Sequence, residues 1–153
     1  MKLATLCYLK KDNKTLMLFR NKKNNDMNGG KWIGLGGKIE EGETPEECAI
    51  REIKEESGYI AKNLILKGIL TFPAFDGFEC WYVFLYLVTD FDGDLIESSE
   101  GTLKWIDDER LKELPMWEGD KIFLNWLNEK GIYSAKFIYK NNEFIDYYFT
   151  KYI

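Results

Sequence analysis

The chain has 153 residues, of which 45% are hydrophobic, 31% charged and 16% aromatic, and these values predict one globular domain over residues 1–153. Its net charge of −5 argues against a nucleic-acid partner or a membrane surface, because both attract basic proteins. Histidine is absent, which excludes Ser-His and Cys-His nucleophiles as well as histidine-bound metals.

Apolar runs separated by turn residues predict strands along most of the chain. In chain order these strands occupy residues 2–9, 15–20, 31–33, 63–72, 78–89, 102–106, 132–139 and 143–149. Asp76-Gly77 and Asn141-Asn142 predict hairpin turns, and the strand at 78–89 is apolar enough to be central. Basic residues of the loop ending at Gly30 could meet a triphosphate, although a solvated loop explains them equally well: Arg20, Lys22 and Lys23.

The first predicted helix has clear signals at both ends. Thr44 is a suitable N-cap, Pro45 fits the first helical position, Glu47 completes a capping box, and Gly58 provides the stop. The apolar stripe expected to face the core consists of Ala49, Ile50 and Ile53. Further helical segments are predicted at 107–114 and 120–130. Helices mixed with hairpin-linked strands indicate the α+β class, with a mixed sheet between helices.

Three carboxylates share one face of the first helix, because Glu52, Glu55 and Glu56 fall at positions i, i+3 and i+4. Like charges at this spacing repel one another, and Arg51 offsets part of the repulsion because it reaches Glu55. The remaining charge suits Mg²⁺, which prefers oxygen ligands. Because histidine is absent, acid–base chemistry must depend on carboxylates or on metal-bound water, with lysine or tyrosine as remote options.

This helix lies in a longer pattern that resembles the signature of the Nudix hydrolases. The pattern is Gly37, five residues, Glu43, seven residues and then Arg51-Glu52-Ile53-x-Glu55-Glu56-x-Gly58. Tyr59 departs from it, since the family usually has an aliphatic residue there. An exposed acidic helix face is the plainer explanation of the carboxylates alone. The resemblance implies an α/β/α sandwich in which the signature forms a loop–helix–loop catalytic motif.

The chain is most similar to the MutT-like 8-oxo-dGTP diphosphatases of this family. Three stretches carry that similarity: residues 31–38, residues 116–120, and residues 135–137 with 145–147. The resemblance implies Mg²⁺-dependent hydrolysis, with Mn²⁺ able to substitute, of oxidised purine nucleoside triphosphates to monophosphate and pyrophosphate. Such an enzyme sanitises the nucleotide pool and so avoids mutation.

The same resemblance implies the site residues. The metal ligands would be Gly36 (through its carbonyl), Glu52, Glu55, Glu56 and Glu100. The catalytic group would be Arg51, Glu52, Glu55 and Glu56, with the general base left open among Glu55, Glu56 and Glu100. The substrate would be bound by Thr5, Arg20, Ile33, Gly36, Gly37, Lys38, Trp117, Glu118 and Asp120. Trp117 would stack on the purine, and Asp120 would hydrogen-bond its edge.

Two departures from the pattern of the mammalian enzymes affect which nucleobase the site would recognise. Ile33 stands where the mammalian enzymes have a base-reading Asn, and Gly119 replaces an Asp of their base-reading pair, for which Glu118 is the available substitute. Trp117 could instead belong to the core, and Asp120 could simply cap the helix at 120–130.

Other functions and the cellular setting complete these expectations. One alternative is a Nudix hydrolase of another nucleotide such as ADP-ribose, because that group often has a proline about as far beyond the signature as Pro73 is here. The other alternative is a non-catalytic nucleotide-sensing domain. Cys7, Cys48 and Cys80 are isolated and read as buried thiols in a reducing compartment. We therefore expect a cytoplasmic monomer whose partner is a small nucleotide.

Overall fold

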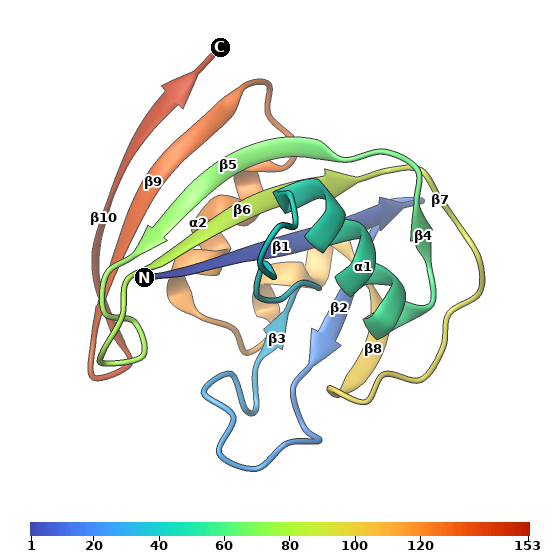
Figure 1. Ribbon diagram of the computed structural model, residues 1–153, viewed down its shortest axis with the longest axis horizontal. Helices are drawn as coiled ribbons and strands as arrows, with labels where there is room; N and C mark the ends of the chain where they lie inside the picture. Colours follow the sequence, from blue (N-terminus) through green and yellow to red (C-terminus); the bar gives the residue numbers. More distant parts are fainter.

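The computed structural model describes residues 1–153 and places helices on both faces of an eight-stranded sheet (Figure 1). In chain order the elements are β1 (Lys2–Lys11), β2 (Lys14–Phe19), β3 (Trp32–Ile33), α1 (Pro45–Ser57), β4 (Ile60–Ala61), β5 (Ile65–Phe72), β6 (Trp81–Val88), β7 (Phe91–Asp92), β8 (Thr102–Asp107), the 3₁₀ helix η1 (Asp108–Glu113), α2 (Glu118–Trp126), β9 (Ile132–Lys140) and β10 (Glu143–Tyr152). The predicted α+β class and α/β/α sandwich are confirmed.

The sheet is mixed, with the strand order β10-β9-β5-β6-β1-β2-β3 and with β8 also paired to β2. Strands β1 and β6 are parallel, as are β5 and β9, whereas the other neighbours are antiparallel. The aromatic strand β6 lies between β5 and β1, as its apolar sequence predicts. Strands β4 and β7 form a separate two-stranded pair. None of the helices combines the length and the apolar sequence that a bilayer-spanning helix requires.

Strand β1 is the point at which the sheet forks. It pairs with β6 from Lys2 to Leu9, but its pairing with β2 is confined to Lys10 and Lys11. The glycine-containing segment 35–39 lies beside the rest of β1. The N–H of Thr5 donates to the Gly37 carbonyl at 2.9 Å, and the N–H of Cys7 donates to that of Leu35. This fork holds the loop that precedes α1 against the middle of the fold.

Each face of the sheet has its own hydrophobic core because side chains alternate along the strands. Tyr8 and Met17 point toward α2, where they join Phe123 and Phe137. Their chain neighbours Cys7, Leu9, Leu16 and Leu18 point to the other face and pack against Ala49 and Ile53 of α1. The two helices are therefore attached to opposite faces of the same strands.

Two details of the helices differ from the sequence-based expectation. Ile50 is 40% exposed, and the buried face of α1 includes instead the polar residues Glu56 and Ser57, of which Glu56 contacts Gly36 in the fork. Helix α2 spans Glu118–Trp126 rather than 120–130, since the chain turns after Trp126 toward Gly131, whose φ is +95°. Cys80 is only half-buried, whereas Cys7 and Cys48 are buried as expected.

Both predicted hairpins form, but only the turn between β9 and β10 is the tight turn that its dipeptide predicts. Asn141 and Asn142 have φ of +52° and +67°, the left-handed values that a two-residue hairpin between β9 and β10 requires. The β5–β6 connection is longer than the Asp76-Gly77 dipeptide suggests, because it includes all of residues 73–80. That longer loop brings Phe75 back over the sheet.

Candidate active site

The capping box predicted for α1 fixes the start of the helix. The Thr44 hydroxyl accepts from the Glu47 N–H at 3.0 Å, and the Glu47 carboxylate accepts from the Thr44 N–H at 3.0 Å. Gly58 ends the helix with φ of +83°. Both ends of helix α1 are thus fixed by caps, and this determines the direction in which its acidic face points.

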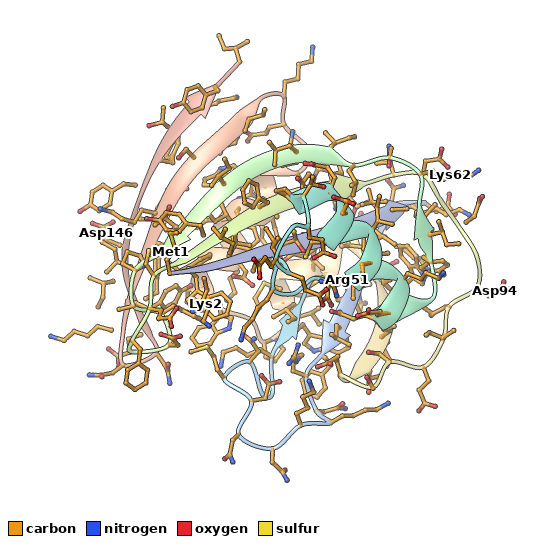
Figure 2. The ribbon with its side chains drawn as sticks, in the orientation of Figure 1. Met1, Lys2, Arg51, Lys62, Asp94 and Asp146 are labelled. Atoms are coloured by element: carbon orange, nitrogen blue, oxygen red, sulfur yellow. The ribbon has the colours of Figure 1, made fainter.

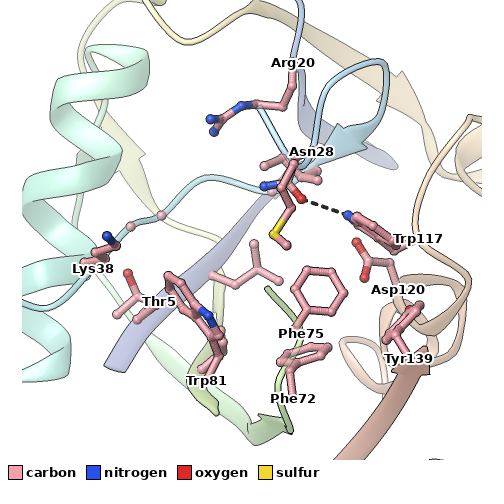
Figure 3. Close-up of a pocket in the computed structure, with 18 residues that line it drawn as sticks. Thr5, Arg20, Asn28, Lys38, Phe72, Phe75, Trp81, Trp117, Asp120 and Tyr139 are labelled. Atoms are coloured by element: carbon pink, nitrogen blue, oxygen red, sulfur yellow. Dashed lines mark hydrogen bonds between the residues drawn. The ribbon is translucent and has the colours of Figure 1, made fainter. Parts of the chain in front are cut away.

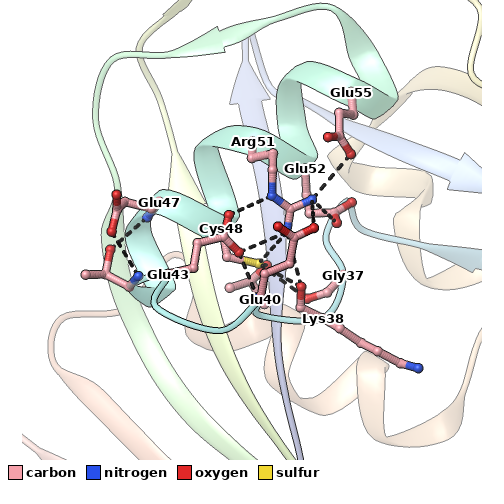
Figure 4. Close-up of polar contacts among 11 residues, drawn as sticks. Gly37, Lys38, Glu40, Glu43, Glu47, Cys48, Arg51, Glu52 and Glu55 are labelled. Atoms are coloured by element: carbon pink, nitrogen blue, oxygen red, sulfur yellow. Dashed lines mark hydrogen bonds and ion pairs between the residues drawn. The ribbon is translucent and has the colours of Figure 1, made fainter.

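Arg51 belongs to α1 and lies near the middle of the molecule in the view of Figure 2, where Asp94 is at the edge. Its Nε donates to Glu43 Oε2 at 2.6 Å, and its Nη1 donates to Glu52 Oε1 at 2.8 Å and to Glu55 Oε2 at 3.4 Å (Figure 4). The guanidinium holds the pKa of Glu43 low, at about 2. Arg51 therefore positions carboxylates on both sides of the loop–helix junction, and it does not line the cavity described below.

Arg51→Gln is expected to lower activity by about 10–100-fold, a typical effect of losing the groups that orient metal ligands. The variant cannot bridge Glu43 and Glu52, so Glu52 loses its fixed direction. Steady-state kinetics over a Mg²⁺ titration should show a higher metal requirement. Arg51→Lys keeps the charge without the planar fork and should lose less activity. Unchanged metal dependence in Arg51→Gln would contradict this role.

Glu56 is the buried carboxylate of the acidic face. Its Oε1 accepts from the Gly36 N–H at 3.4 Å, whereas its Oε2 is buried without any hydrogen-bond partner. Burial, followed by the charge of Glu52, raises the pKa of Glu56 to about 9. A buried oxygen with no partner is costly, so this environment suits a cation that would bind the ionised form.

The other predicted metal ligands differ in their neighbours and in their exposure to solvent. Glu52 lies so near the backbone that a Cβ on Gly37 would be 2.6 Å from its carboxyl group. Glu100, whose charge also raises the pKa of Glu56, pairs with Lys23 at 2.7 Å and with Arg20 at 3.4 Å. The Glu55 side chain is 59% exposed. No three acidic or cysteine side chains are already arranged so that they could hold a metal ion.

A cavity of about 300 Å³ opens beside this acidic cluster (Figure 3). Its wall contains eight of the nine predicted substrate residues, namely Thr5, Arg20, Ile33, Gly36, Gly37, Lys38, Trp117 and Asp120. Glu118 lies outside the wall, with a side chain that is 62% exposed and paired with Lys121. One continuous space therefore runs from the glycines beside α1 to the start of α2.

Trp117 combines the two roles that the sequence leaves open. Its ring is buried and makes edge contacts with Phe75 and Tyr139, with ring centroids 4.7 and 5.4 Å apart, yet it also forms part of the cavity wall. The indole Nε1 donates to Asn28 Oδ1 at 2.8 Å. Trp117 is thus a core residue that presents an aromatic surface to the cavity.

Asp120 does not cap α2. The N-cap position is Trp117, no side chain caps the helix, and the Asp120 N–H donates to the Trp117 carbonyl. The carboxyl group of Asp120 instead lies in the cavity wall, and burial alone raises its pKa to about 8. At neutral pH it is mostly protonated, so it can both donate and accept hydrogen bonds.

A family model described as the NUDIX domain matches residues 1–127. The chain belongs to the Nudix family. An uncharacterized Nudix hydrolase of Bacillus subtilis, YvcI, is 34% identical over 141 residues, which cover 89% of this chain and 85% of the relative. The oxidized purine nucleoside triphosphate hydrolase of Danio rerio is 28% identical over 144 residues, which cover 94% of this chain and 90% of the relative. The crystal structure of a MutT protein from Bacillus halodurans is 32% identical, with a TM-score of 0.85 and 97% of each chain covered.

The Nudix signature therefore occupies α1 and the loop in the fork of β1. Sequence reasoning missed much of the cavity wall beyond the signature, which comes from loops and strand ends: Met27, Asn28, Phe72, Phe75, Trp81 and Tyr139. The high aromatic content was the available signal for four of these residues, and the Asn-rich loop was the signal for Asn28. Neither signal says which side chains meet.

Asp120→Asn is expected to flatten the pH dependence of stability of this Nudix protein. The folded-state pKa of Asp120, about 8, lies above the ordinary value of 3.8, so unfolding releases a proton between these pH values. The free energy of unfolding should fall as pH rises through this window, and the Asn variant should have a shallower slope that retains the part due to Glu56. Urea unfolding in chelator between about pH 5 and about pH 8 measures it. Equal slopes in both proteins would refute the assignment.

Proposed function

We propose that this Nudix protein is a divalent-metal-dependent pyrophosphohydrolase of oxidised purine nucleoside triphosphates such as 8-oxo-dGTP. Its products would be the monophosphate and pyrophosphate, and its role would be to remove damaged nucleotides before a polymerase uses them. The observation that carries the proposal is the single cavity joining Gly36 and Gly37, beside the acidic face of α1, to Trp117 and Asp120. A nucleotide requires both ends of this cavity, because its charged phosphates need cations and polar groups whereas its base needs aromatic and apolar side chains.

The phosphate end fits Mg²⁺, with Mn²⁺ as a substitute. The Gly36 carbonyl, Glu52, Glu56 and Glu100 would hold the metal, and Glu55 would join them from its exposed position. The buried, partnerless Glu56 Oε2 supports this assignment, because a cation would relieve the cost of its charge. A bound ion would neutralise the phosphates and lower the pKa of a water molecule.

The side chains of the chain itself orient the reactants. Arg51 keeps Glu52 directed toward the glycine loop. Lys38 lies in the cavity wall and is a cation available to the phosphates. Glu56, protonated at neutral pH without metal, would hold or release a proton close to the Gly36 backbone. These groups form the polar end of the cavity.

The base end is aromatic and mostly apolar. Phe72, Phe75, Trp81 and Trp117 supply flat surfaces, which accept any purine by stacking. Asp120 adds a group that can match the edge of the base, and a mismatched base would leave it unpaired. The similarity to the Danio rerio enzyme, which is named for oxidized purine triphosphates, supports this choice of substrate.

A panel of nucleotides with Mg²⁺ tests the proposal. We expect kcat/KM to be highest for 8-oxo-dGTP, pyrophosphate to be released instead of phosphate, and activity to vanish in excess chelator. ADP-ribose and the undamaged triphosphates belong in the same panel. A clear preference for ADP-ribose would establish the alternative Nudix hydrolase, and binding without turnover of any nucleotide would establish a sensor.

A further inference from the structure

The loop of residues 20–31, between β2 and β3, brings an amide into the base end of the cavity. Asn28 is half-buried and forms part of the cavity wall. Ile33, which lies in the same wall, has no polar side-chain atom and cannot read a base by hydrogen bonding. A hydrogen-bonding group for the base must therefore come from another residue, and Asn28 is the one amide in the wall.

Asn28 is held at its backbone and at its side chain. Its N–H donates to Asp26 Oδ1 at 3.1 Å, and Asp26 Oδ2 accepts from Arg20 Nε at 2.7 Å. The Asp26 side chain is only 8% exposed, so this pair anchors the loop to the end of β2. The side-chain Oδ1 of Asn28 accepts the indole N–H of Trp117. The amide is thus positioned before any ligand binds.

The contact with Trp117 also settles which way the amide points. An indole nitrogen can only donate a hydrogen bond, so the oxygen of Asn28 must face Trp117. The Nδ2 group then lies on the side of the amide that faces away from the indole (Figure 3). No acceptor in the protein takes a hydrogen bond from this nitrogen. Asn28 therefore presents donors alone to a bound ligand.

We infer that Asn28 selects the base, by donating from Nδ2 to the 6-carbonyl oxygen of a 6-oxopurine and so disfavouring 6-aminopurines. The inference rests on the proposed function in that the ligand is a purine nucleotide. A donor facing a 6-amino group would meet a second donor, which leaves both unpaired inside the cavity. Asp120, which can donate or accept, matches a second position on the base without deciding between carbonyl and amino groups.

The test compares dITP with dATP, which differ in the 6-oxo or 6-amino group and in the adjoining N1 proton. Wild type should prefer dITP in kcat/KM. Asn28→Asp keeps the acceptor for Trp117 but replaces the donor with an acceptor, and should lower the dITP/dATP ratio about tenfold or more. Asn28→Ser removes the amide donor without adding charge, and should lower the same ratio. Asn24→Asp adds the same charge to an exposed position of the loop and should leave the ratio unchanged.

A binding measurement keeps the inference separate from the proposed hydrolysis. Calorimetric titration with IMP and AMP reports the same preference without any turnover. If neither triphosphate is hydrolysed but IMP binds more tightly, and Asn28→Asp loses that preference, the proposed function fails and the role of Asn28 stands. If the ratio of wild type is close to one, or if both Asn28 variants keep the wild-type ratio, Asn28 is only a support for Trp117 and the inference is overturned.

Discussion

Glu56→Gln is expected to lower turnover by about 10²–10⁴-fold, the contribution typical of a carboxylate that acts on a proton or a metal-bound water. Glu56 is the acidic side chain of α1 with a buried, partnerless oxygen, and it lies against Gly36 in the fork of β1. Glutamine has the same shape and can still accept the Gly36 N–H, so the loss should be chemical. Single-turnover kinetics at saturating Mg²⁺ and 8-oxo-dGTP would measure it.

The same substitution should stabilise the metal-free protein above the ordinary carboxyl pKa. The folded-state pKa of Glu56 is raised to about 9 from 4.5, so the unfolded state loses this proton at a lower pH than the folded state does. The free energy of unfolding therefore falls as pH rises through this window. Glutamine never ionises and removes this cost. Thermal unfolding in chelator should therefore give a higher Tm for the variant near neutral pH. Glu41→Gln, at an exposed position of the preceding loop, is the control and should change neither turnover nor Tm.

Gly36→Ala should cost ~3 kcal/mol or more of stability and abolish activity, because the backbone leaves no room for a side chain. A Cβ at this position would be 2.0 Å from the Thr5 carbonyl oxygen, and the φ of +151° is itself unfavourable for other residues. Thr5 cannot retreat, since it is paired with Phe84 on one side and bonded to Gly37 on the other. Denaturant unfolding and circular dichroism would measure the loss.

Gly42→Ala separates the two causes. Gly42 has φ of +81° but no heavy atom within 4 Å of an added Cβ, so alanine there should cost only the ~1–2 kcal/mol of the left-handed conformation. The difference between the two variants measures the close approach of the loop to β1. Equal costs at both positions would mean that the glycine loop is free to move away from the strand.

Local signals in the sequence were sufficient for α1 and for most strands. The capping box at Thr44 and Glu47 and the stop at Gly58 involve residues within one or two turns of each other, so the pattern alone predicts the helix. The hairpin at Asn141-Asn142 is legible for the same reason. The apolar run of β6, which no solvated face interrupts, predicts the central position that this strand has in the sheet.

Long-range contacts limited the prediction of the site. The sequence suggests that Arg51 pairs with Glu55 one turn away, but the shortest contact of Arg51 is with Glu43 in the preceding loop. The sequence allows Asp120 to be a helix cap, but in the folded protein α2 begins at Glu118, so Asp120 lies inside the helix. The bond between Asn28 and Trp117 joins residues 89 positions apart, and no periodicity of the chain encodes such a meeting.

The two ends of the cavity are built by different parts of the chain. Gly36, Gly37 and the carboxylates of α1 belong to one loop–helix unit, whereas Met27, Asn28 and Phe75 come from the connections at 20–31 and 73–80. Each connection joins antiparallel segments whose register is held by the sheet itself. Exchanging these two loops for those of a relative should consequently alter the base preference while Trp117, Asp120 and the loop–helix unit of α1 stay unchanged, which makes the scaffold a modular starting point for engineering nucleotide selectivity.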